Sequence, residues 1–286
     1  MASAKHYTEE ELIKLRQIQM NIYREIKRIC DNHNIQFVAI GGSAIGAVRH
    51  KGYIPWDDDL DIAMMREEYV RFLEYAKNEI GPYYFVQNIG TDKYYGNYFT
   101  KIRCNGTLFV QNIDKNDKSH HGIFVDIFPI DRVTDNVTER EKYRKKLMFV
   151  FQMYMAKCNS GISGETASMK GKIKHFVRAS LHVLLTFASK EKLFTKVDEL
   201  SQIYNKAKPK TLMISVVFAM TGRCIEDDAV FPPVELPFEE DTMMVPHDID
   251  RYLTHIFGDY MKLPPIEKRV NHRPVQLSFG EETLDF

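Results

Sequence analysis

Two carboxylates alternate with apolar residues where a short apolar run begins, in the stretch WDDDLDIAMM at residues 56–65. Residues i and i+2 of a strand face the same side, so Asp59 and Asp61 would lie roughly 6–7 Å apart while the intervening residues point into a core. A slip of one residue would turn the acids inward, so the alternation also predicts the register of the strand. Two carboxylates at this spacing can flank a divalent cation.

The acidic run begins two residues earlier, which leaves a second pairing open. Asp57 and Asp59 have the same spacing as Asp59 and Asp61, and Asp58 lies between them. A run of acids is often only a solvated loop, and short motifs are frequently false positives. On a half-buried strand, however, these charges repel one another, and a bound cation would offset that repulsion.

A glycine turn precedes the acidic run. The mainly apolar residues 35–40 are followed by Gly41, Gly42 and Ser43 and then by the helix-like segment AIGAVRH. A strand, a glycine turn and a helix opening at Ser43 would present free backbone N–H groups to an anion such as phosphate. By itself the turn could be purely structural, but its position just before the acidic run favours a phosphate site.

A third acid lies in a strongly apolar segment, HHGIFVDIFPID at residues 120–131. Apolar residues alternate around Asp126, so the segment reads as a strand, and we expect Pro129 to end it. An unpaired carboxylate in such surroundings would be costly. Asp126 is therefore either a third metal ligand on a neighbouring strand or the partner of Lys101 or Arg103, which share one face of the predicted strand YFTKIRC.

These stretches resemble the LicD family of phosphotransferases, which includes bacterial phosphocholine transferases and is related to fukutin-related protein. The resemblance is clearest over residues 35–131, in GGSAIGAVRHKGYIPWDDDLDIAM and HGIFVDIFPID. It returns in VPHDIDRYLTHIFGDYMKLPP, which Arg269 and His272 follow. It implies an α/β (α+β) fold of the nucleotidyltransferase superfamily, with a mixed sheet and flanking helices. We expect residues 1–134 to form the catalytic core and residues 135–286 a mainly helical lobe that closes the substrate cleft.

The resemblance also implies roles for individual residues. Asp59, Asp61 and Asp126 would be the catalytic acids and would hold one or two Mg²⁺ ions, which Mn²⁺ could replace. Asp61 or Asp126 could also accept the proton of the acceptor hydroxyl. The candidate substrate-binding residues are Gly42, Ser43, Arg49, His50, Lys101, Arg103, His121, Arg269 and His272. Arg49 and His50 could equally serve only to cap a helix C-terminus.

The implied reaction is the transfer of a phospho-alcohol, foremost phosphocholine, from a CDP-activated donor such as CDP-choline, with release of CMP. The acceptor would be a hydroxyl of a cell-surface glycan precursor of teichoic acid, capsule or lipopolysaccharide. Two alternatives are a nucleotidyltransferase that moves NMP onto a small molecule and a non-catalytic nucleotide- or glycan-binding relative. Aromatic faces for a choline cation could come from Trp56, Tyr83, Tyr84, Tyr94 and Tyr95, although core packing explains most such residues.

Composition narrows the partners and the compartment. The 286 residues carry 39 basic and 39 acidic side chains, so no excess charge favours nucleic acid. The N-terminus lacks the apolar core of a signal peptide, and four scattered cysteines are typical of free thiols, so we expect a cytoplasmic protein without a zinc site. Residues 8–33 and 137–157 read as helices, and residues 159–168 as a loop. The basic and apolar segment 171–194 could pack in a core or make a peripheral membrane contact.

Overall fold

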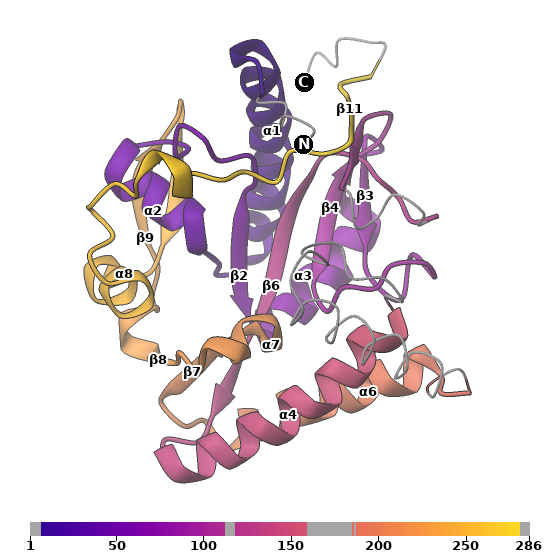
Figure 1. Ribbon diagram of the computed structural model, residues 1–286, viewed down its shortest axis with the longest axis vertical. Coiled ribbons are helices and arrows are strands. Elements are labelled where there is room, and N and C mark those ends of the chain that lie inside the picture. The colour runs from indigo at the N-terminus through magenta and orange to yellow at the C-terminus, as the bar shows by residue number, and fades with distance from the viewer. Residues whose placement is uncertain (1–6, 112–117, 159–184, 186, 281–286) are drawn as a thin grey trace.

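A mixed sheet forms the centre of the molecule (Figure 1). The computed structural model describes residues 7–111, 118–158, 185 and 187–280. The main strands lie in the order β1 (Val38–Ala39), β2 (Asp61–Met65), β6 (Phe124–Val133), β4 (Thr100–Cys104) and β3 (Tyr84–Gln87). β2 and β6 are parallel, whereas the other neighbours are antiparallel. This is the mixed α/β fold that the sequence predicted.

Two helices cover one face of this sheet. α1 (Glu9–His33) begins at a capping box in which Thr8 and Glu11 exchange hydrogen bonds, and it buries Leu15 and Ile22. α3 (Arg66–Glu79) packs beside α1, and both helices contact β6. The predicted helix at residues 8–33 is therefore confirmed, and its apolar face packs against the sheet.

Strand β6 is longer than predicted. It continues through Pro129 to Val133, so the expectation that Pro129 would end the strand was wrong. On one edge of β6 the pairing with β4 stops at Ile127, and the pairing with β7 (Thr211–Ile214) starts at Ile130. Pro129 lies in the gap between these two partner strands. The backbone N–H that proline lacks would have no strand to pair with there, so no hydrogen bond of the sheet is lost.

A second helical layer lies beside the sheet, at the bottom of Figure 1. α4 (Val137–Cys158) confirms the predicted helix, and it packs against α6 (Lys190–Ser201) around its own buried apolar cluster. The predicted loop at 159–168 and most of the amphipathic segment 171–194 fall outside the described residues. Among the residues that are described, no helix combines the length and apolar character needed to cross a bilayer.

Arg66 on α3 links this layer to the sheet through two ion pairs. Both guanidinium nitrogens Nε and Nη2 of Arg66 bond to Asp131, at 2.9 and 2.6 Å, and Asp131 is fully buried. Nη1 of Arg66 lies 3.1 Å from Asp198 on α6. Bidentate geometry of this kind is the strongest form of an Arg–carboxylate contact.

The C-terminal part of the chain contains strands as well as the predicted helices. β8 (Ile225–Glu226) extends the sheet beyond β7, and β9 (Val234–Phe238) pairs with β10 (Asp241–Val245). The helical elements are α7 (Ser215–Phe218), α8 (Ile249–Phe257) and the short helices η2 (Asn205–Ala207), η3 (Ala219–Thr221), η4 (Asp227–Ala229) and η5 (Ile266–Lys268). The division of the chain at residue 134 stays a prediction.

The final described segment returns across the sheet, as the yellow ribbon in Figure 1 shows. β11 (Gln276–Ser278) pairs with β5 (Leu108–Val110). This pairing brings the C-terminal segment back over the core.

Candidate active site

The parallel pairing of β2 and β6 brings two of the predicted acids together. Asp61 and Asp126 are direct register partners, although they lie far apart in the sequence. Asp59, two residues before Asp61, is close enough to raise the pKa of both residues by charge repulsion. All three predicted catalytic acids therefore gather at the start of β2.

This cluster carries more negative charge than its surroundings compensate. Burial, followed by the charges of Asp59 and Asp126, raises the pKa of Asp61 well above its usual range. Burial also raises the pKa of Asp126, against the opposing effect of Lys101. A divalent cation at this position would neutralise the repulsion, and carboxylate oxygens are the donors that Mg²⁺ prefers. The chemistry of these donors therefore suits a magnesium ion, although the group of potential ligand atoms that lie within 4.8 Å of one another among the described residues is Asp58, Asp59 and His272.

Asp57 is a fourth acid at the site. Burial and the neighbouring charges of Asp59 and Asp58 raise its pKa to about 7. A side chain at Gly42 would collide with the Asp57 carboxylate, so the glycine lets this acid lie against the helix α2 (Gly41–His50). The sequence left open whether Asp59 pairs with Asp57 or with Asp61, and the structure brings all three acids into one cluster.

Lys101 is, among the described residues, the basic side chain in direct contact with Asp126. Its Nζ lies 2.6 Å from Asp126 Oδ1 and 3.3 Å from the centre of the Phe124 ring. Burial lowers the pKa of Lys101, although Asp126 opposes this effect. The ion pair that the sequence offered as an alternative is therefore present. Within the described part of the chain, Oδ2 of Asp126 has no hydrogen-bond partner and remains available to a cation.

Arg103 shares a face with Lys101, as the alternation on β4 predicted. Its guanidinium also lies over the Phe124 ring, at 4.8 Å. Nε donates to Gln87 Oε1 and Nη1 donates to the carbonyl of Gly122, each at 2.6 Å. These bonds hold Arg103 within the sheet, and its contact with a donor phosphate stays a prediction.

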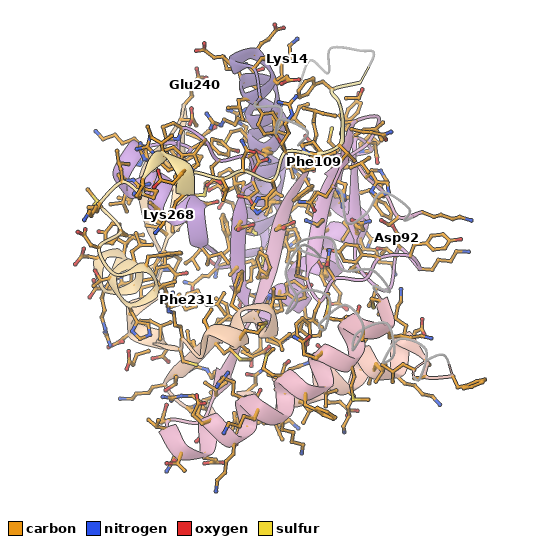
Figure 2. All side chains as sticks on the ribbon, in the orientation of Figure 1. Lys14, Asp92, Phe109, Phe231, Glu240 and Lys268 are labelled. Carbon is orange, nitrogen blue, oxygen red and sulfur yellow. The ribbon has the colours of Figure 1, made fainter. Side chains whose placement is uncertain are left out.

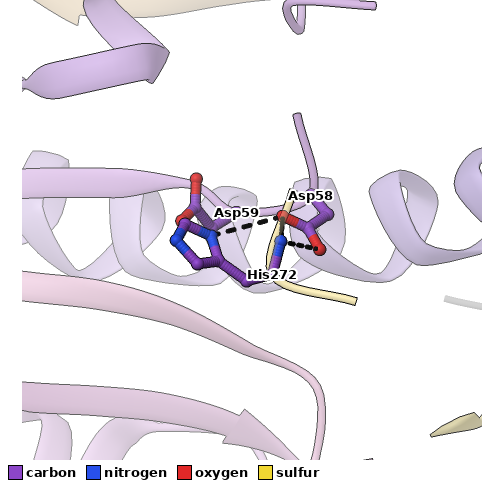
Figure 3. Close-up of side chains that lie close together, drawn as sticks. All are labelled: Asp58, Asp59 and His272. Carbon is purple, nitrogen blue, oxygen red and sulfur yellow. Dashed lines mark hydrogen bonds and ion pairs between the residues drawn. The ribbon is translucent and has the colours of Figure 1, made fainter. Parts of the chain in front are cut away.

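Asp58 anchors the C-terminal segment beside the acids (Figure 3). It is fully buried, accepts the Tyr7 hydroxyl at 2.7 Å and accepts the backbone N–H of His272 at 3.0 Å. The His272 ring extends from there to Asp59, with Nδ1 at 3.2 Å from Oδ2. Hydrogen bonds to Asp58 and Asp59 raise the pKa of His272 to about 10. The role of Asp58 was left open by the sequence analysis, and the structure supplies one.

Residues of α1 hold the acidic loop in place. Nη2 of Arg16 donates to the carbonyls of Ile54, Pro55 and Asp57 at 2.9 to 3.0 Å. Gln19 Nε2 donates to the carbonyl of Asp58 at 2.9 Å. Sequence reasoning missed both residues, because single polar positions on an amphipathic helix carry no sign of what they contact.

The glycine turn positions the strand that carries Asp61. Gly41 has φ of +58°, a left-handed conformation that favours glycine, and α2 starts there, two residues before the predicted opening at Ser43. Ser43 Oγ accepts the N–H of Asp61 at 2.9 Å, and the N–H of Ile40 donates to the Asp61 carbonyl at 3.1 Å. The phosphate contact predicted for Gly42 and Ser43 stays a prediction.

Three other predicted residues form a basic group around Trp56. Arg269 stacks on the Trp56 ring at 4.6 Å. Burial and the charge of Arg269 lower the pKa of Arg49, and burial and Arg49 lower the pKa of His50. Arg49 Nε also donates to His50 Nε2 at 2.9 Å. These residues therefore form one basic group, which reaches Trp56 through Arg269.

The remaining candidates are more scattered. The backbone carbonyl of His121 accepts the N–H of Phe109 at 2.6 Å, at the edge of β5. Tyr95 is buried against Phe99, close enough to Asp126 for that charge to raise its pKa, whereas Tyr83 and Tyr94 are exposed. A choline-binding role for any of these aromatic residues stays a prediction.

Comparison with known proteins agrees with this geometry. Residues 34–158 match the LicD/FKTN/FKRP nucleotidyltransferase domain, and all three predicted catalytic acids lie within this range. The chain is 28% identical over 261 residues to the lipopolysaccharide cholinephosphotransferase LicD of Haemophilus influenzae, covering 88% of this chain and 92% of that protein. An uncharacterised protein of Rickettsia typhi is 36% identical over 73 residues, covering 25% of this chain and 22% of that protein. Residues 34–158 therefore match a LicD-type nucleotidyltransferase domain, and the chain as a whole is similar to a LicD cholinephosphotransferase.

Proposed function

We propose that this protein transfers phosphocholine from CDP-choline to a hydroxyl of a cell-surface glycan, foremost lipopolysaccharide, in a Mg²⁺-dependent reaction in the cytoplasm. The name of the Haemophilus influenzae relative supports the transferred group and the acceptor, since the alignment extends over most of both chains. Teichoic acid and capsule precursors are alternative acceptors for the same chemistry.

The observation that carries the proposal is the register pairing of Asp61 with Asp126, with Asp59 beside them. Three carboxylates on adjacent backbone segments form a cluster of hard oxygen donors with excess negative charge. A magnesium ion held by them would neutralise charge on the phosphoryl group as it is transferred.

The chain itself supplies orientation and charge. The ion pair of Lys101 holds the Asp126 carboxylate in place, and His272 brings a positive charge to Asp59. The side chain of His272 is 60% exposed, so this cation also faces the solvent from which a negatively charged donor must arrive.

The reaction balances as a single in-line displacement. The acceptor hydroxyl oxygen forms a bond to the phosphorus of the phosphocholine group, and the phosphorus–oxygen bond to CMP breaks. Asp61 or Asp126 takes the proton of the hydroxyl, and CMP leaves with the electron pair of the broken bond.

The test is a donor panel with product analysis. Purified protein with Mg²⁺ and lipopolysaccharide is incubated with CDP-choline, CDP-ribitol, CDP-glycerol or CDP-ethanolamine, and CMP release is followed. CMP from CDP-choline, with phosphocholine on the acceptor, is the expected result. Pyrophosphate release from a nucleoside triphosphate would instead indicate NMP transfer, and bound nucleotide without either product would indicate a binding protein.

A further inference from the structure

A short segment beside the site exposes an unusual concentration of apolar side chains. Met261 and Leu263 are 54% and 47% exposed, Ile266 77% and Val270 70%, and Phe257 precedes them at 44%. Isolated exposed apolar residues are common on soluble proteins, but several within one short segment form a patch. We call residues 257–270 the apolar loop.

The backbone of the apolar loop is held in one conformation. Arg49 Nη1 donates to the carbonyl of Tyr260 at 2.6 Å, and Arg269 Nε donates to the carbonyl of Pro264 at 3.0 Å. The N–H of Lys268 donates to the carbonyl of Pro265 at 2.9 Å, which closes η5. These bonds hold the backbone that presents the apolar side chains to solvent.

Basic side chains border the same segment. Lys262, Lys268 and Arg269 lie within it, against the acids Asp259 and Glu267. Lys268 marks the short helix η5 beside α2 in Figure 2. Arg49 adds another positive charge through its bond to the loop, and Asp250 adds a negative one where it accepts the Tyr260 hydroxyl at 2.8 Å, so a basic excess of about one charge remains in a chain whose formal net charge is zero.

The apolar loop leads directly to the candidate active site. Arg269 stacks on Trp56, the residue before Asp57, and His272 contacts Asp59 only two residues after Val270. Two residues of extended chain span about 7 Å, so the exposed surface and the acids are neighbours. An acceptor held at this surface would have its sugar hydroxyls within reach of the acids.

We propose that the apolar loop docks the protein on the surface of an anionic lipid bilayer, with its apolar side chains between the headgroups and its basic side chains at the phosphates. Apolar side chains ringed by lysine and arginine are suited to such an interface. The biological purpose of this docking rests on the proposed function, since a lipopolysaccharide acceptor is itself a membrane lipid. The docking surface differs from segment 171–194, for which the sequence predicted a possible membrane contact.

The test is vesicle binding by the full chain without substrate. Vesicles of phosphatidylcholine are compared with vesicles that contain phosphatidylglycerol, by co-sedimentation and by the fluorescence of Trp56, the only tryptophan in the chain. We expect binding to the anionic vesicles and a change in Trp56 emission, because this residue lies under Arg269. Each basic side chain near the surface should strengthen binding about fivefold at low salt.

Matched variants locate the contact. Ile266→Asp should weaken vesicle binding about tenfold or more, and Lys268→Gln by about fivefold. Val70→Asp on α3, which is also exposed in the wild type, should leave binding unchanged. Absence of binding by the wild type, or an equal loss in Val70→Asp and Ile266→Asp, would overturn the proposal.

The outcome can be separated from that of the proposed reaction. Asp61→Asn should bind vesicles like the wild type, since Asp61 does not belong to the apolar loop. Wild-type protein that binds vesicles but releases no CMP would refute the reaction and leave the docking surface standing. Release of CMP without vesicle binding would refute the docking surface alone.

Discussion

Replacing Asp57 by asparagine should stabilise this protein at alkaline pH in the absence of divalent cations. Burial and neighbouring acids raise the pKa of Asp57 from 3.8 to about 7, so folding disfavours its charged form. The folded protein therefore binds this proton more tightly than the unfolded chain does, and the wild type loses stability as pH rises from about 4 to about 7. An asparagine has no charge to lose, so the variant escapes this penalty.

The size of the effect follows from the shift. The pKa of Asp57 is raised by about three pH units, which corresponds to about 4 kcal/mol of stability lost by the wild type above pH 7. At pH 5 only about one of these three pH units takes effect, so the loss is under about 2 kcal/mol. These values are upper bounds, because an amide is also costly to bury and the acids titrate together. For a chain of this size, about 2 °C per kcal/mol gives a rise in Tm of up to about 8 °C at pH 8.

The assay is thermal unfolding in EDTA at pH 5 and pH 8, followed by circular dichroism. Asp131→Asn is the matched control, because it replaces a buried acid whose charge is compensated by Arg66. That variant should lose about 3–5 kcal/mol, since it leaves the Arg66 charge without its partner. A Tm gain for Asp57→Asn that is the same at both pH values, or a loss at pH 8, would refute the reasoning.

Three further variants test the site. Asp61→Asn should lower CMP release about a thousandfold with unchanged circular dichroism, because several kcal/mol of cation-mediated stabilisation are lost; near-normal turnover would contradict the metal assignment. Lys101→Met should cost about 3–5 kcal/mol in urea unfolding, because it leaves Asp126 buried without its partner; an unchanged midpoint would show that the pair adds nothing. His272→Gln should lower Tm most at pH 6, because a pKa raised from 6.5 to about 10 contributes stability that is complete below pH 6.5 and lost as pH rises through 10. Thermal unfolding at pH 6, 8 and 10.5 checks this last expectation, and a pH-independent deficit would contradict it.

Local patterns in the sequence were enough to predict the elements that carry the site. Alternation predicted the strands of Asp61, Asp126 and Lys101, and helical periodicity predicted α1 and α4. The adjacency of Asp61 and Asp126 could not follow from alternation, because strand order and parallel register depend on the whole sheet. The sequence offered a neighbouring strand for Asp126 as one of two alternatives, and the resemblance to a known family favoured it.

The errors and omissions have a common physical origin in long-range contacts. Pro129 was expected to end a strand, but the gap between two partner strands accommodates it. Arg16 contacts the acidic loop from α1, Tyr7 contacts it from just before that helix, and Arg66 on α3 pairs with Asp131 on β6. Single polar side chains of this kind have no periodicity, so only the folded arrangement identifies their partners.

The register of β2 and β6 has a consequence for how the protein folds. Between these parallel strands the chain forms α3, β3, β4 and β5, so a long loop must close before Asp61 meets Asp126. We expect the cation site to be absent from early folding intermediates and to form only when β6 docks on β2. Only the fully folded protein then binds the cation. A divalent cation should therefore slow unfolding and leave the rates of the early folding phases unchanged.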